Sequence, residues 1–183
     1  MKTTAKLFCY FLAASYIPAA VVHAILKAIL PNGRVFGSLF HMFLYHERYP
    51  YQYIGVVALV YAVVASIGAV LWSATRGWRR WIAIIGIMVG TVIIASVPGG
   101  ILWSIHDMEA GFYPASDLFW SHIQRDALNG LGLGWLILYL SVPYNIIGLI
   151  VGYWVTATGF RLRERWKKEE RDVAPGNQEG EFR

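Results

Sequence analysis

The chain has 183 residues, of which 57% are hydrophobic and only 15% charged, and its mean hydropathy is +0.47. Soluble domains are usually about 45–50% apolar and about 25% charged, so one water-soluble core of this length cannot bury so many apolar side chains. The formal net charge is +5, but most basic residues lie beside apolar runs, which is typical of membrane topology signals and not of nucleic-acid binding. The single cysteine, Cys9, excludes an intrachain disulfide framework.

Four long apolar segments predict four membrane crossings, because a spanning helix needs about 20 mainly apolar residues. The expected spans cover residues 7–30, 54–74, 81–105 and 133–160. The last span lies in a charge-free stretch, residues 127–160, which would be about 51 Å long as one helix, whereas the hydrocarbon core is about 30 Å thick. We therefore expect a bent or unwound start at 129–134 and a kink at Pro143.

The first apolar segment has an alternative interpretation as a cleaved signal peptide. Lys2 and Lys6 precede it, and Val22, His23 and Ala24 loosely resemble a cleavage site. The apolar sequence continues to Leu30, however, which is longer than a usual signal-peptide core, so we favour a membrane span.

Two segments between the spans are too short to cross a bilayer and predict helices lying on its surface. Residues 34–48 are apolar and aromatic with a polar end, and residues 116–128 begin with a plausible N-cap at Ser116. Residues 161–183 form a charged tail, expected to continue the last helix and to end disordered. The predicted fold is all-α: a four-helix transmembrane bundle over residues 1–160, with two short interfacial helices on its outer face.

The basic residues predict the orientation of the chain. With the N-terminus inside, twelve of the sixteen lie on the inner side, which is a strong positive-inside signal. These twelve are Lys2, Lys6, Arg76, Arg79, Arg80, Arg161, Arg163, Arg165, Lys167, Lys168, Arg171 and Arg183. Both termini of this multi-pass inner (plasma) membrane protein are then cytoplasmic, and all five histidines fall on the outer side or in the outer half of the first span.

Histidine and carboxylate residues on the outer side form the candidate site. His106 and Glu109 are three residues apart, and His122 and Asp126 are four apart, so each pair shares a helix face. Imidazole and carboxylate groups bind Zn, Fe, Cu or Mn, and a catalytic zinc site needs three protein ligands and an open position. The same groups also suit metal-free acid–base chemistry, or are solvated and structural groups at the membrane boundary. These spacings are common by chance.

Other polar residues extend this set. His41, His46, His23 and Asp107 are possible additional ligands, although His41 and His46 are five residues apart and point to different faces of a helix. His23 lies four residues before Lys27, a residue expected to extend its ammonium group to the headgroups.

Four glycines and one amide have expected structural roles. The pairs Gly86/Gly90 and Gly148/Gly152 permit close helix approach, within the bundle or in a dimer, and Asn145 is expected to bond another helix.

The sequence leaves three functions open. We favour a non-enzymatic subunit, anchor or partner-binding module with its polar site on the extracytoplasmic face, in contact with the lipid bilayer and with a membrane protein or a second copy. The alternative is a membrane-embedded metal- or haem-binding enzyme that uses the outer histidines and acids. A transporter is disfavoured, because three of the four spans carry no ionisable group at depth.

Overall fold

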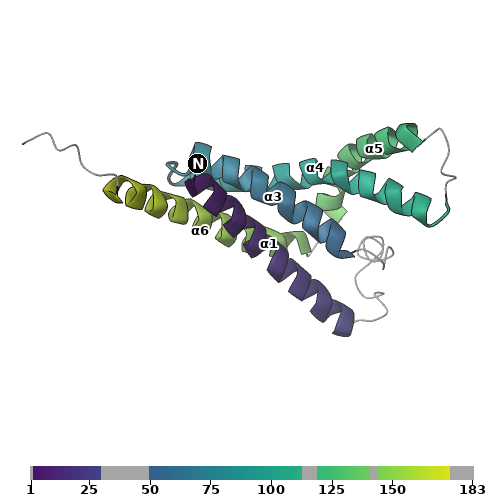
Figure 1. Cartoon of the computed structure of the whole chain (residues 1–183), viewed down its shortest axis with the longest axis horizontal. Coiled ribbons are helices and arrows are strands. Elements are labelled where there is room, and N and C mark those ends of the chain that lie inside the picture. Colours follow the sequence, from purple (N-terminus) through teal and green to yellow (C-terminus); the bar gives the residue numbers. More distant parts are fainter. Residues whose placement is uncertain (1, 30–49, 113–118, 141–143, 174–183) are drawn as a thin grey trace, which may run out of the picture.

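The computed structural model describes residues 2–29, 50–112, 119–140 and 144–173, and these residues form five helices and no strand. The helices are α1 (Lys2–Ile29), α3 (Pro50–Trp72), α4 (Trp78–Glu109), α5 (Phe119–Leu140) and α6 (Tyr144–Val173) (Figure 1). The predicted all-α class is confirmed. The interfacial helix expected over 34–48 lies outside the described residues, as does the end of the tail, residues 174–183.

Three helices are long and apolar enough to cross a membrane, in agreement with the first three predicted spans. They cover Thr3–Ile25, Tyr51–Trp72 and Trp78–Glu109. Their outward faces carry large apolar side chains, such as Ile17, Ile67 and Ile82, each more than half exposed. Isolated exposed apolar residues are ordinary on soluble proteins, but a continuous apolar surface over several helices is what lipid contact requires.

The four-span bundle is not confirmed, because the structure differs from the expectation after residue 116. In place of an interfacial helix over 116–128 and a span over 133–160, α5 runs without a break from Phe119 to Leu140, through the expected bend at 129–134. A second helix, α6, starts at Tyr144 and continues through the basic segment to Val173. The expected kink at Pro143 lies outside the described residues. Neither α5 nor α6 is among the three helices that qualify as membrane spans.

Contacts along α4 fix the directions of the neighbouring helices. From the start of α4 onward, Arg80 meets Ala157, Met88 meets Gly152, Ser96 meets Gly130 and Gly100 meets Asp126. The partner numbers fall as the α4 numbers rise, so α6 and α5 both run antiparallel to α4. In sequence order, α5 lies along the second half of α4 and α6 along the first half.

A five-residue turn joins α3 to α4 and makes them an antiparallel hairpin. Thr75 closes the end of α3 through backbone and hydroxyl hydrogen bonds to the Trp72 carbonyl, at 3.0 and 2.6 Å. Gly77, the residue before α4, has φ 61°, a left-handed conformation that glycine adopts without the steric cost of a β-carbon.

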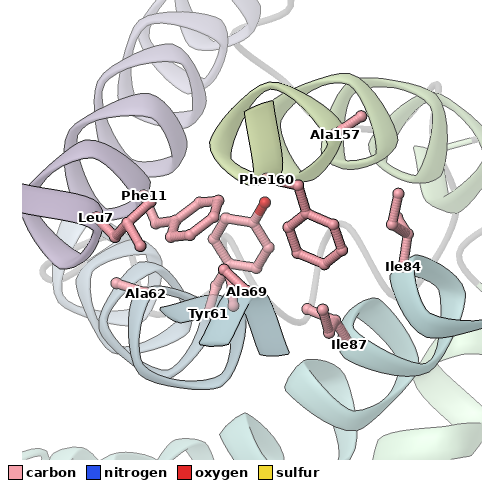
Figure 2. Packing of buried hydrophobic residues seen from close by; sticks show 10 residues of the cluster. Leu7, Phe11, Tyr61, Ala62, Ala69, Ile84, Ile87, Ala157 and Phe160 are labelled. Carbon is pink, nitrogen blue, oxygen red and sulfur yellow. The ribbon is translucent and has the colours of Figure 1, made fainter. Parts of the chain in front are cut away.

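The core lies where α1, α3, α4 and α6 meet, and Figure 2 shows the rings of Phe11, Tyr61 and Phe160 packed together there. Alanines on α3 let the neighbouring helices approach closely, as small residues do in membrane bundles. These alanines, spaced three or four residues apart, are Ala58, Ala62, Ala65 and Ala69. Tyr61 Oη lies 2.8 Å from Thr156 Oγ1 and ties α3 to α6 inside this core.

Candidate functional site

His106, near the end of α4, is the buried member of the predicted polar site. Its Nε2 lies 3.1 Å from Gln52 Oε1, and its Nδ1 lies 3.1 Å from Tyr53 Oη, both in the first turn of α3. An amide oxygen only accepts, so Nε2 donates to Gln52, while Nδ1 and the Tyr53 hydroxyl share the second hydrogen bond. The rings of Tyr53 and His106 also pack edge to face, with centroids 5.5 Å apart. This arrangement joins α3 to α4.

The second half of the predicted set lies on α5, at the helix crossing with α4. A β-carbon at Gly100 would overlap the Asp126 carbonyl oxygen, and one at Gly130 would overlap the Ser96 carbonyl oxygen. Two glycines, one on each helix, therefore bring the two backbones into direct contact. Gly130 thus packs against α4 within the segment 129–134, where the sequence alone favours a bend.

The side chains of His122 and Asp126 share Arg125 as a neighbour. Arg125 Nη2 lies 3.1 Å from His122 Nδ1, and Arg125 Nε lies 3.3 Å from Asp126 Oδ1. Arg125 is exposed, and an exposed ion pair of this kind contributes little to stability, about 0–1 kcal/mol. Glu109 at the end of α4 is exposed.

Metal binding is not supported within the described parts of the chain. No group of three or more His, Cys, Asp or Glu side chains is placed to hold a metal ion there. The two ring nitrogens of His106 are directed to Tyr53 and Gln52, so neither is directed to a cation. Asp107 adjoins this cluster in sequence, and His41 and His46 lie outside the described residues.

His23 is placed at the same end of the bundle as His106. Its ring packs edge to face on Tyr51, with centroids 5.3 Å apart, and so links the second half of α1 to the start of α3. The Lys27 side chain lies outside the described part. Both histidines therefore contact the first turn of α3. His23 packs on Tyr51, and His106 is hydrogen-bonded to Gln52 and Tyr53.

The glycines singled out by sequence divide into two groups. Gly152 packs against Met88, so it permits the approach of α6 to α4. A β-carbon at Gly86, Gly90 or Gly148 would meet no described atom within 4 Å. The side chain of Asn145 lies outside the described residues.

The opposite end of the bundle gathers basic side chains from three helices. The Lys6 ammonium lies 5.7 Å from the Trp166 ring, and the Arg80 guanidinium lies 5.5 Å from the Phe160 ring. Arg163 donates to Ser73 in the α3–α4 turn. At a rise of 1.5 Å per residue, Arg80 and His106 on α4 are separated by roughly 40 Å along the helix.

The open side of α5 is an exposed surface that combines apolar and polar side chains. α5 packs mainly on α4, as Figure 1 also shows. Trp120 and Leu128, two turns apart on one face of α5, are each 70% exposed, and Phe112 at the end of α4 is 69% exposed. Arg125 and Gln124 lie exposed between them. Aromatic and arginine side chains are enriched in protein interfaces.

Sequence reasoning missed Gln52 and Arg163 as partners in these contacts. Gln52 is an amide beside the start of an apolar span, and a polar group at that position is a usable signal. The Arg163–Ser73 contact joins residues 90 positions apart, and no local spacing pattern reports it.

A scan against protein-family models, a search of curated proteins and a search of solved structures each found no match.

Proposed function

We propose that this chain is a polytopic inner-membrane protein of bacterial or archaeal type that serves as a subunit or anchor and binds a partner membrane protein. The partner-binding surface is the open face of α5, at the histidine-bearing end of the bundle, which is extracytoplasmic. The observation that carries the proposal is that α5 rests mainly on α4 and leaves Trp120 and Leu128 each 70% exposed.

The proposal includes a fourth crossing made of two helices in succession. α5 descends from the outer end along the second half of α4, and α6 follows along the first half. The contacts of Gly130 with Ser96 and of Gly152 with Met88 support this order. The segment 144–160 is free of charge and is bounded by Arg161, as expected where a helix leaves the bilayer. Both termini are then cytoplasmic.

The distribution of charge supports this orientation. Lys6, Arg80 and Arg163, from three different helices, come together at one end of the bundle. Segments rich in lysine and arginine stay on the cytoplasmic side during insertion, so the end that carries His23 and His106 faces outward.

The test is co-purification of the tagged full-length chain from its native membranes in a mild detergent. The variant Trp120→Ala/Leu128→Ala removes two exposed side chains from α5. The control Ile67→Ala/Leu71→Ala removes two from α3, which are 55% and 61% exposed.

We expect a stoichiometric partner, or a second copy of the chain, with the wild type and the α3 control but not with the α5 variant. Loss of anchors in a docked interface typically costs 2 kcal/mol or more each. An identical set of co-purifying chains in all three preparations would contradict the proposed surface. Release of the wild type from membranes by alkaline carbonate would contradict the membrane assignment itself.

A further inference from the structure

Two arginine side chains flank Phe160 where α3, α4 and α6 meet. Arg80 Nη2 donates to the Ala157 carbonyl at 3.1 Å, and its guanidinium lies 5.5 Å from the Phe160 ring centroid. Arg163, one turn after Phe160, donates to the Ser73 hydroxyl in the α3–α4 turn. Both side chains are half-buried, so their positive charges are fixed at the junction of three helices.

Within the described ranges, neither guanidinium forms an ion pair with a carboxylate, and the ion pair of Arg125 with Asp126 lies toward the opposite end. Three more arginines are near these two in sequence and are exposed: Arg76 in the α3–α4 turn, Arg79 on α4 and Arg161 on α6. A half-buried charge without a counterion is unfavourable, and five guanidinium groups in one region repel each other. The junction therefore favours an anion.

The chemistry of the donors favours a phosphate group. A guanidinium has five N–H donors, and Arg80 and Arg163 each use one of them in the contacts above. The remaining donors match the geometry of phosphate oxygens, for which arginine is suited by its planar fork.

Exposed tryptophans set the depth of this region in the membrane. Trp78 and Trp81 on α4 and Trp154 on α6 are 69%, 54% and 61% exposed, and the ring of Trp81 lies 4.8 Å from that of Tyr153. Tryptophan concentrates at the level of the lipid headgroups. Arg79 and Arg80, which lie between Trp78 and Trp81 on α4, are thus at the depth of lipid phosphates, and Arg163 contacts the turn that precedes them.

We propose that Arg80 and Arg163, assisted by Arg76, Arg79 and Arg161, bind the phosphate group of an anionic phospholipid at the α3–α4–α6 junction. The lipid supplies the counterion that the described carboxylates do not, and so it stabilises the junction. Basic pockets between membrane helices on the cytoplasmic side bind such headgroups. This inference rests on the membrane insertion proposed above.

The test is thermal unfolding of the purified full-length protein in an uncharged detergent with added phosphatidylglycerol. We expect the midpoint to rise by roughly 5–10 °C when the lipid is at about a hundredfold excess over its dissociation constant. Zwitterionic phosphatidylcholine and inorganic phosphate are expected to change the midpoint by less than about 1 °C. Equal shifts with the two lipids would overturn the inference, and an equal shift with inorganic phosphate would replace the lipid by a free oxyanion.

Matched variants connect the shift to the junction. Arg163→Gln is expected to abolish most of the phosphatidylglycerol shift, whereas Arg125→Gln, which removes one positive charge toward the other end, keeps it. Arg76→Gln/Arg79→Gln removes only exposed side chains, so folding is preserved, and it is expected to raise the lipid concentration at half-maximal shift about tenfold. An unchanged shift in Arg163→Gln, or in the exposed double variant if Arg163→Gln does not fold, would overturn the proposal. If the chain resists carbonate extraction but shows no lipid preference, this inference fails while the membrane assignment stands.

Discussion

His106 Nε2 and Gln52 Oε1 lie 3.1 Å apart and join the last turns of α4 to the first turn of α3. With the Tyr53 hydroxyl on Nδ1, both ring nitrogens are satisfied inside the protein. Of the site predicted from sequence, His106 is thus a structural link between two helices, and its partners come from a part of the chain 53 and 54 positions away.

We predict that His106→Ala destabilises the protein more than His122→Ala does. The first substitution removes a buried ring and two hydrogen bonds, one to the half-buried Tyr53 hydroxyl and one to the exposed Gln52 amide, which costs about 1–3 kcal/mol. The second removes a more exposed ring next to the exposed Arg125 side chain and should cost less than about 0.5 kcal/mol. Unfolding midpoints in detergent micelles measure the difference, and equal midpoints for the two variants would contradict the buried link.

The helix crossing predicts opposite effects for two glycines that are two residues apart on α5. Gly130→Ala places a methyl group against the Ser96 backbone carbonyl, and overpacking of this kind costs about 1–3 kcal/mol. Gly132→Ala meets no described atom within 4 Å, so it gains up to about 1 kcal/mol from helix propensity. Chemical denaturation of both variants in micelles measures whether each substitution raises or lowers the free energy of unfolding. A stabilising Gly130→Ala would show that α5 does not contact α4 there.

The hydroxyl pair in the core predicts a modest, coupled effect. Tyr61→Phe and Thr156→Val each remove one side of the 2.8 Å contact between α3 and α6. Each should lower the free energy of unfolding by about 0.5–1.5 kcal/mol. The double variant should lose less than the sum of the two single losses. Strict additivity in this double-mutant cycle would mean that the hydroxyls do not interact.

Chelation is expected to leave the unfolding midpoint of the purified protein unchanged within about 1 °C. The reason is that both ring nitrogens of His106 are occupied by hydrogen bonds within the protein, Nε2 with Gln52 and Nδ1 with Tyr53. A chelator-induced drop that is present in the wild type and absent in His106→Ala would instead assign a metal to this histidine.

Hydropathy along the chain was sufficient to predict the three described helices before residue 110, whereas the helix expected over 34–48 stays a prediction. The three predicted spans 7–30, 54–74 and 81–105 correspond to α1, α3 and α4, because about 20 consecutive apolar residues have few alternatives to a helix. Pro18 and Pro98 lie inside α1 and α4 without ending them.

The region after residue 116 could not be predicted in the same way, because its structure depends on contact between distant residues. Gly130 lowers the local helix propensity. The close contact of its backbone with the Ser96 carbonyl on α4 offsets this loss of helix stability. The candidate site could not be predicted fully for the same reason. Spacing places His106 with Glu109 and His122 with Asp126, but the burial of His106 and its bonds to Gln52 and Tyr53 depend on how α3 meets α4.

Labelling of single cysteines in intact cells tests the account most directly, because every functional proposal depends on which end of the bundle faces outward. In a Cys9→Ser background, Phe112→Cys marks the exposed end of α4, and Thr75→Cys marks the α3–α4 turn. A membrane-impermeant maleimide is expected to label Phe112→Cys in intact cells and Thr75→Cys only after permeabilisation. Labelling of Thr75→Cys in intact cells, with protection of Phe112→Cys, would contradict the orientation on which the α5 partner surface and the arginine–lipid junction depend.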